Sequence, residues 1–457
     1  MRETNPVMPP PSPRSPKRRA WLIPVIVAAI VWVLAGAGVG ALWAFRGGGD
    51  ELAETEGTSA STTTSAVGDS HGLVRVEVLD PDPARGVASE RVGVGPADQV
   101  LVLMAEGKGR AEAEAVAAAG AVRNGATQYT QATGLDALRE RISSWYATRF
   151  GVNVPARRIV ITAGASAALQ LACLALIDAG DEILMPDPSY PCNRQFVSAA
   201  EGTPVLVPCT AAERYQLSSS KVEAAWKNGV TRGVLLASPS NPTGTSIHPD
   251  EMRRIHTLVS RRGGITLVDE IYLGLSFDET YGKTALEIDD QIISINSFSK
   301  YFNMTGWRLG WLVVPEKLTP VIERIAQNLF ICPSSISQQA ALACFEDASI
   351  SEHEKRRAEF KARRAYFIPA LQSLGFEIPV MPDGAFYAWA DCSQICSKLG
   401  VASSWELAFE IMQKAHIAVT PGRDFGSFET AKFIRFSTAS SMPTLVEAIA
   451  RLKAMLS

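Results

Sequence analysis

The sequence predicts an α/β fold in which a mostly parallel sheet of seven strands is covered by helices, followed by a smaller α+β region. Short runs rich in Val, Ile and Leu recur along the middle of the chain, and several are separated by segments with apolar residues at helical spacing. Short buried strands that alternate with helices are typical of such sheets. The runs cover residues 158–162, 182–185, 204–208, 233–237, 265–268, 291–295 and 309–313.

Length and composition exclude several classes of protein. The chain has 457 residues, enough for two or three domains of about 150 residues. Its formal net charge of −3 gives no electrostatic case for binding nucleic acid. The seven cysteines and five histidines are scattered, and no Cys-x-x-Cys pair occurs. We therefore expect reduced thiols and no structural metal site.

The N-terminal segment predicts a membrane anchor. Residues 1–19 form a Pro/Ser-rich basic tail, and no charged side chain occurs over the 26 residues from Ala20 to Phe45. Because about 20 apolar residues cross a bilayer, we predict a transmembrane helix at 20–46, followed by a flexible linker at 47–72. Basic residues before the span place the rest of the chain outside, whereas reduced cysteines suit the cytoplasm. The side of the membrane therefore stays open, and the alternative is a soluble cytoplasmic enzyme.

The body of the chain divides into three predicted parts. They are an N-terminal arm with part of the small domain, a large domain, and an interdomain helix with a small C-terminal domain, at residues 73–120, 121–315 and 316–457. Apolar residues at helical spacing predict a helix at 134–149. A second helix is predicted at 165–179, with Gly180 as its C-cap.

Polar residues follow five of the predicted strands at the point where each strand ends. In open α/β sheets a ligand binds at the carboxyl ends of the strands. These polar segments, which we expect to meet at one site, are residues 162–166, 187–191, 240–244, 269–272 and 297–300.

The residue types at these strand ends suit an aldehyde cofactor that carries a phosphate. A lysine in an apolar strand-end pocket has a lowered pKa and can form a Schiff base, and Lys300 occupies such a position. Arg308, Ser297 and Ser299 could hold the phosphate. The start of the second helix adds backbone N–H donors from Gly164, Ala165 and Ser166.

The remaining strand ends offer groups for an aromatic ring. Asp269 could pair with a protonated ring nitrogen, and Tyr272 and Asn241 could bind a ring hydroxyl. Tyr190 offers a flat face for stacking.

In combination these motifs resemble those of the class I/II aminotransferases, which are fold type I enzymes that depend on pyridoxal 5′-phosphate. The resemblance covers roughly residues 73–457. The motifs that carry it are Asn241-Pro242-Thr243-Gly244, Asp269-x-x-Tyr272, Ser297-Phe298-Ser299-Lys300 with Arg308, and Ile434-Arg435-Phe436-Ser437.

The resemblance implies a role for each residue of the site. Lys300 would carry the cofactor as an aldimine and transfer protons, Asp269 would pair with the pyridine nitrogen, and Tyr272 and Asn241 would bind its O3′ oxygen. Arg435, with Asn241, would bind the substrate, and Arg435 would grip its carboxylate. The phosphate would contact Ser297, Ser299, Arg308 and residues 164–166, and Tyr190 would stack on the ring. Tyr129 would reach the phosphate of a second subunit, which implies a homodimer.

The implied activity is transfer of an amino group between an L-amino acid and a 2-oxo acid. Two alternatives stay open: a β-elimination lyase acting on C–S bonds at the same lysine, and a sensor that binds the cofactor without turnover. One departure concerns the substrate side. The family usually carries a Gly-x-Gly-x-Pro type segment before the Tyr129 region, whereas residues 103–109 contain no proline.

Overall fold

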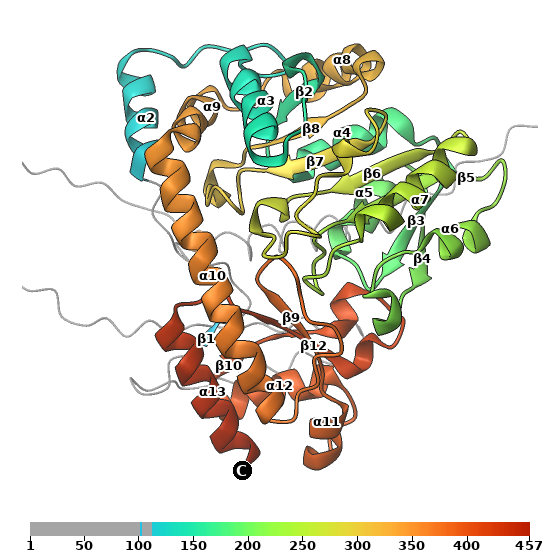
Figure 1. Cartoon of the computed structure of the whole chain (residues 1–457), viewed down its shortest axis with the longest axis vertical. Helices are drawn as coiled ribbons and strands as arrows, with labels where there is room; N and C mark the ends of the chain where they lie inside the picture. Colours follow the sequence, from blue (N-terminus) through green and yellow to red (C-terminus); the bar gives the residue numbers. More distant parts are fainter. Residues whose placement is uncertain (1–100, 103–111) are drawn as a thin grey trace, which may run out of the picture. The chain divides into compact units, whose positions relative to one another are not determined.

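The computed structural model describes residues 101–102 and 112–457, which belong to a compact unit running from His71 to Ser457 (Figure 1). The predicted tail, transmembrane helix and linker lie outside the described residues, and so does the departure at 103–109. Within the described part, no helix is both long and apolar enough to cross a bilayer.

A seven-stranded sheet forms the centre of the large domain. Its strands lie in the order β2-β8-β7-β6-β5-β3-β4, and β8 alone among them runs antiparallel to its two neighbours. All seven predicted strands, and the mostly parallel sheet, are confirmed. The strands are β2 (Ile159–Thr162), β3 (Glu182–Asp187), β4 (Thr203–Pro208), β5 (Thr231–Ala237), β6 (Ile265–Asp269), β7 (Ile293–Ser297) and β8 (Gly310–Val313).

Helices cover both faces of this sheet, because successive strand residues point to opposite sides and both sides are apolar. Leu235 packs in one core with α4, α5 and α8, whereas Leu236 packs in another with α6 and α7. A further core lies between β2, β8 and α3. These helices are α3 (Asp136–Phe150), α4 (Ala165–Leu176), α5 (Pro191–Ala199), α6 (Ser219–Ala225), α7 (Pro249–Arg261) and α8 (Thr319–Phe330).

One predicted helix boundary is wrong. The helix predicted at 165–179 ends at Leu176, and Gly180 is not its cap, since its N–H donates to the carbonyl of Glu201 over 3.0 Å. A polar turn ends the helix instead: the Asp181 carboxylate accepts the N–H of Asp178, which offers the backbone a partner outside the helix. The helix predicted at 134–149 is confirmed as α3.

A smaller α+β region follows, with a core of its own. The long helix α10 connects the two regions (Figure 1). In its first half, His353 and Phe360 contact the core of β2, β8 and α3, and in its second half Phe367 and Leu371 lie in the core of the small region. The remaining elements are α2 (Glu112–Arg123), α9 (Ser335–Leu342), α10 (Asp347–Ser373), α11 (Ser393–Leu399), α12 (Ser404–Ala415), α13 (Met442–Leu456), β1 (Leu101–Val102), β9 (Tyr387–Asp391), β10 (Ile417–Ala418), β11 (Thr420–Pro421) and β12 (Phe433–Ser437).

The small three-stranded sheet, ordered β11-β12-β9, separates its two faces by residue parity. Ile434 and Phe436 point into the small core. Arg435 pairs with Trp389 across the strands, so these two side chains share the opposite face. That face meets the large domain, because the Tyr387 hydroxyl lies 2.6 Å from that of Tyr272.

An aromatic core lies directly under the Lys300 segment. Phe298 and Phe302, on either side of the lysine, both pack against Trp311 of β8, at ring-centroid distances of 5.0 and 6.3 Å. The Trp311 indole N–H donates to the Tyr146 hydroxyl over 3.2 Å. The lysine backbone is thus supported from below by rigid, fully buried rings.

We expect Trp311→Ala to lower the free energy of unfolding by about 3–5 kcal/mol, because it leaves a cavity among these rings and removes the partner of Tyr146. Urea denaturation followed by circular dichroism measures this change. The matched control is Val446→Ala on the exposed face of α13, for which we expect a change within about 0.5 kcal/mol. Equal losses in both variants would show that the rings do not support the fold as described.

Candidate active site

Because β8 runs antiparallel to β2 and β7, its first residue lies at the edge of the sheet where those two strands end. Gly310, the first residue of β8, pairs with Thr162 at the end of β2 and with Ser297 at the end of β7. Arg308, two residues earlier, therefore lies at the edge where the parallel strands end. Sequence reasoning placed Arg308 near the serines by chain proximity, and the strand order brings it to the start of α4 as well.

Arg308 and the first turn of α4 form an anion-binding arrangement. A Cβ added to Gly164 would lie 2.7 Å from Nη2 of Arg308, so only glycine allows the guanidinium to approach the backbone so closely. Gly164 also has φ of 85°, which other residues rarely adopt. The N–H groups at a helix N-terminus and a neighbouring guanidinium both attract a phosphate.

The two serines of the predicted phosphate site lie at the same edge. Ser297 and Ser299 are buried, and the Ser297 hydroxyl accepts the N–H of Ser299 over 3.0 Å. Ser166 is exposed at the start of α4, and Ala165 precedes it as a buried residue. The structure thus brings these predicted phosphate ligands to one edge of the sheet.

Lys300 is buried near two positive charges, those of Arg435 and Arg308. Burial lowers the pKa of its ammonium group to about 7, and the charges of Arg435 and Arg308 act in the same direction. Its Nζ lies 5.4 Å from the centre of the Tyr272 ring and 5.8 Å from that of Phe386. A lysine in this setting is partly neutral, and therefore nucleophilic, near pH 7.

Asp269 ends β6 as a buried carboxylate. Burial raises its pKa to about 7, and the neighbouring charge of Glu270 adds to this. Hydrogen bonds from the Ile271 N–H, at 3.2 Å, and from the Asn193 side chain oppose the rise in pKa. Glu270 differs, because its oxygens accept bonds from three nearby donors, namely Thr284, Ala285 and Ser294. Glu270 therefore stabilises the fold, whereas Asp269 suits a cationic ligand atom.

The guanidinium of Arg435 is held in one orientation. Its Nη1 donates to Oδ1 of Asn241 over 2.8 Å, and its Nη2 donates to Thr420 over 3.2 Å. It also lies 4.5 Å from the centre of the Tyr387 ring and 4.9 Å from that of Phe425. A buried guanidinium fixed in this way can bind a carboxylate in bidentate fashion.

Two predicted tyrosines differ in their surroundings. Tyr190 directly precedes α5, and burial, together with nearby groups that include Asp269 and Tyr387, raises its pKa. Tyr190 therefore lies beside the predicted ring site. Tyr129, in the segment between α2 and α3, is 79% exposed.

Sequence reasoning missed several residues of the site. Tyr387 contacts both Tyr272 and Arg435, Thr420 orients Arg435, and Asn193 bonds to Asp269. Tyr387 and Thr420 lie in small-domain strands about which the strand-end rule for the large sheet says nothing. A partial signal existed for Asn193, because this polar residue lies two positions after the predicted strand-end segment 187–191.

The residues present fit pyridoxal phosphate. Some of the buried polar atoms without a hydrogen-bond partner belong to residues near these strand ends and to Arg435, and buried polar atoms normally have a partner. These residues are Ser189, Asn193, Ser240 and Arg435. The close approach of Arg308 to Gly164 suits a phosphate, and the buried carboxylate of Asp269 suits a basic ring nitrogen. Lys300, with its lowered pKa, suits an aldehyde.

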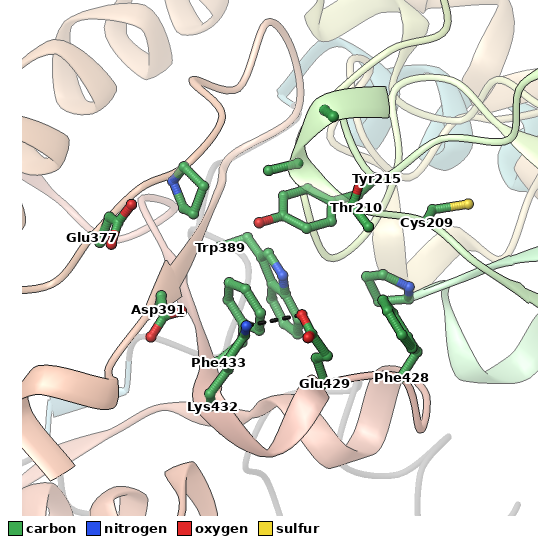
Figure 2. Close-up of a pocket in the computed structure, with 14 residues that line it drawn as sticks. Cys209, Thr210, Tyr215, Glu377, Trp389, Asp391, Phe428, Glu429, Lys432 and Phe433 are labelled. Carbon is green, nitrogen blue, oxygen red and sulfur yellow. Dashed lines mark ion pairs between the residues drawn. The ribbon is translucent and has the colours of Figure 1, made fainter. Parts of the chain in front are cut away.

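A separate cavity of about 410 Å³ lies between the loop after β4 and the small sheet (Figure 2). It is not the catalytic edge, because neither Lys300 nor Arg435 lines it. Trp389 and Phe433 stack in its wall, and Figure 2 shows them side by side near the Glu429–Lys432 ion pair.

Comparison with known proteins gives a consistent result. Residues 104–452 match the family described as aminotransferase class I and II. A valine–pyruvate aminotransferase of Mycobacterium tuberculosis is 34% identical over 335 residues, which are 73% of this chain and 84% of that protein. An aspartate aminotransferase of Rhizobium meliloti is 31% identical over 346 residues, 73% of this chain and 83% of that protein.

The solved structures that resemble this chain are also aminotransferases. The crystal structure of an aminotransferase from Mycobacterium tuberculosis has a TM-score of 0.74 and 33% identity, covering 79% of this chain and 92% of that chain. The family match spans most of the chain, and the fold is shared. This chain therefore belongs to the class I and II aminotransferases and is an aminotransferase that acts on amino acids and 2-oxo acids.

Proposed function

We propose that Lys300 binds pyridoxal 5′-phosphate covalently and is the acid/base of transamination in this enzyme. The observation that carries the proposal is the burial of Lys300 near Arg308 and Arg435, with the pKa of its ammonium group lowered to about 7. The two arginines suit two anions, a phosphate and a substrate carboxylate. When bound, the cofactor supplies an electron sink for the bond broken at the substrate Cα.

The phosphate end is assigned to Arg308, Ser297, Ser299 and the first turn of α4, residues 164–166. Three kinds of donor lie there: a guanidinium, two hydroxyls and the backbone N–H groups at a helix N-terminus, of which that of Gly164 already donates to Thr162. The ring end is assigned to Asp269, with Tyr190 stacking on the ring and Asn241 and Tyr272 near its hydroxyl. A carboxylate whose pKa is raised by burial is stabilised by a protonated pyridine nitrogen, and it keeps that nitrogen protonated in return.

The Lys300 amine would take up and return the proton at the substrate Cα. Arg435 would hold the substrate α-carboxylate, since Asn241 and Thr420 already orient its guanidinium. Tyr387 and Phe425 flank this guanidinium and exclude water from it. Asn241 thus has two proposed contacts, with Arg435 on the substrate side and with the ring hydroxyl.

A second proposal concerns assembly and localisation. Tyr129 is an aromatic residue with little cover from its own chain, which supports a role at the phosphate site of a second subunit in a homodimer. The uncharged segment before residue 46 supports a single-pass membrane anchor; the alternative is a cytoplasmic enzyme.

The assay that tests the function combines cofactor absorbance with product analysis. We expect residues 73–457, loaded with pyridoxal phosphate, to convert an amino acid to its 2-oxo acid and to leave pyridoxamine phosphate. Small aliphatic donors such as valine come first, because a relative is named for valine and pyruvate. Lys300→Ala should lower the rate by about 10²–10⁴-fold, since it removes the proton carrier.

The control is Lys283→Ala, at an exposed lysine, which should leave the rate unchanged. Release of ammonia and pyruvate from a sulfur amino acid without a second oxo acid would favour the C–S lyase. Bound cofactor that no amino acid alters would favour the sensor. Full activity in Lys300→Ala would contradict the assignment of the lysine.

The lowered pKa of Lys300 predicts the pH dependence of cofactor loading. The neutral amine attacks the aldehyde, so the loading rate should rise about tenfold per pH unit up to about pH 7 and level off above it. Replacing Arg435 with Gln removes a neighbouring positive charge and should shift this curve to higher pH. Loading of the apoenzyme is measured by absorbance, with a blocked lysine derivative as the reference for the cofactor's own titration. A curve that rises up to pH 10 would contradict the shift in pKa.

Cell fractionation tests the anchor. We expect the full-length chain to stay with membranes after an alkaline wash and to be released only by detergent. A chain that begins at residue 73 is the control and should appear in the supernatant. A full-length chain found wholly in the supernatant would exclude the anchor.

A further inference from the structure

A cluster of three metal-ligating side chains lies in the described part of the chain, outside the catalytic edge. Glu114 is in α2, Cys344 is in the short helix η7 (Ala343–Phe345), and His353 is in α10. Their ligating atoms all lie within 4.8 Å of one another, and all three residues are buried. The distant helix α2 thus meets two neighbouring elements, η7 and α10, at one polar point beside an apolar core.

His353 indicates that a partner belongs at this point. Its side chain is 2% exposed, and neither ring nitrogen has a hydrogen-bond partner of good geometry. Nε2 faces Oε1 of Glu114 at 4.0 Å, too far for a direct hydrogen bond. Buried imidazoles normally have both nitrogens engaged, so this separation suits an atom lying between the two side chains.

Two of the three separations between the ligating atoms are near those of a zinc site, and all three are below 4.8 Å. Zinc bonds of about 2.0–2.3 Å to nitrogen, oxygen and sulfur place neighbouring ligand atoms about 3.3–3.7 Å apart. The Cys344 Sγ lies 3.3 Å from Oε1 of Glu114, and the Glu114–His353 distance needs a contraction of about half an ångström to reach that range. A thiolate and a carboxylate together neutralise the two charges of zinc, so the buried site carries no net charge.

We propose that Glu114, Cys344 and His353 bind one zinc ion that fastens α2 to η7 and α10. The thiolate and imidazole suit zinc, and the carboxylate disfavours copper(I). The Met304 sulfur lies 3.2 Å from that of Cys344, and the His353 ring packs against Tyr301 and Phe302. The ion would therefore stabilise residues 301–304, which follow Lys300, through their contacts with Cys344 and His353.

The test is the zinc content of the tag-free holoenzyme after expression in zinc-supplemented medium. We expect about one zinc per chain by plasma mass spectrometry, and one sulfur ligand in the X-ray absorption spectrum at the zinc edge. Cys344→Ala and His353→Gln should each reduce zinc to the background level. Glu114→Gln, which keeps the shape of the side chain, should weaken zinc retention during dialysis against a chelator.

Cys173→Ala, at a fully buried cysteine in α4, is the matched control and should keep its zinc. Chelation should lower the unfolding temperature of the wild type and of Cys173→Ala, and leave that of Cys344→Ala unchanged. Background zinc in a folded wild-type enzyme would overturn the proposal. So would zinc that persists in both Cys344→Ala and His353→Gln, because the ion would then lie elsewhere.

Discussion

The direction of β8 is the constraint on which the active site depends. Were β8 parallel to its neighbours, the turn that carries Arg308 would lie at the opposite edge of the sheet. Because β8 is antiparallel, its first residue pairs with the last residues of β2 and β7. One edge of the sheet therefore receives the end of β7, which leads to Lys300, the start of α4 and the Arg308 turn. The anion site and the lysine are thus produced by the same hydrogen-bonding pattern.

Burial then prepares the two ionisable groups at the centre of the site in opposite ways. For Lys300 it disfavours the charged form, so the pKa of its ammonium group falls, and two nearby guanidinium groups add to the effect. For Asp269 burial also disfavours the charged form, but the pKa of a carboxyl group rises. A neutral amine is ready to attack an aldehyde, and a destabilised carboxylate gains most from a cationic partner. Both groups are therefore least stable without the ligand that they are proposed to bind.

The small domain contributes Arg435, the proposed substrate-binding residue, through one face of a short sheet. Arg435 lies in the middle of that face, with Tyr387 on one side and the cluster of Phe425, Trp389 and Phe433 on the other. The cavity shown in Figure 2 lies at this aromatic cluster but does not include Arg435. The Arg435 guanidinium is thus buried against the rings of Tyr387 and Phe425, outside the cavity.

The sequence by itself determined the seven strands, their order along the chain, the polar segments at their ends and the family to which the chain belongs. These follow from local apolar patterns and from motifs read over a few residues. Only the tertiary structure decided the end of α4, the place of Tyr387 and Thr420 beside Arg435, and the meeting of Glu114, Cys344 and His353. The cysteine and histidine spacing predicted no metal site, and no local pattern connects Glu114 with Cys344, which lies 230 residues away in sequence. Such neighbours are chosen by strand order and by the packing of helices across the core, which depend on contacts between distant residues and not on local preference.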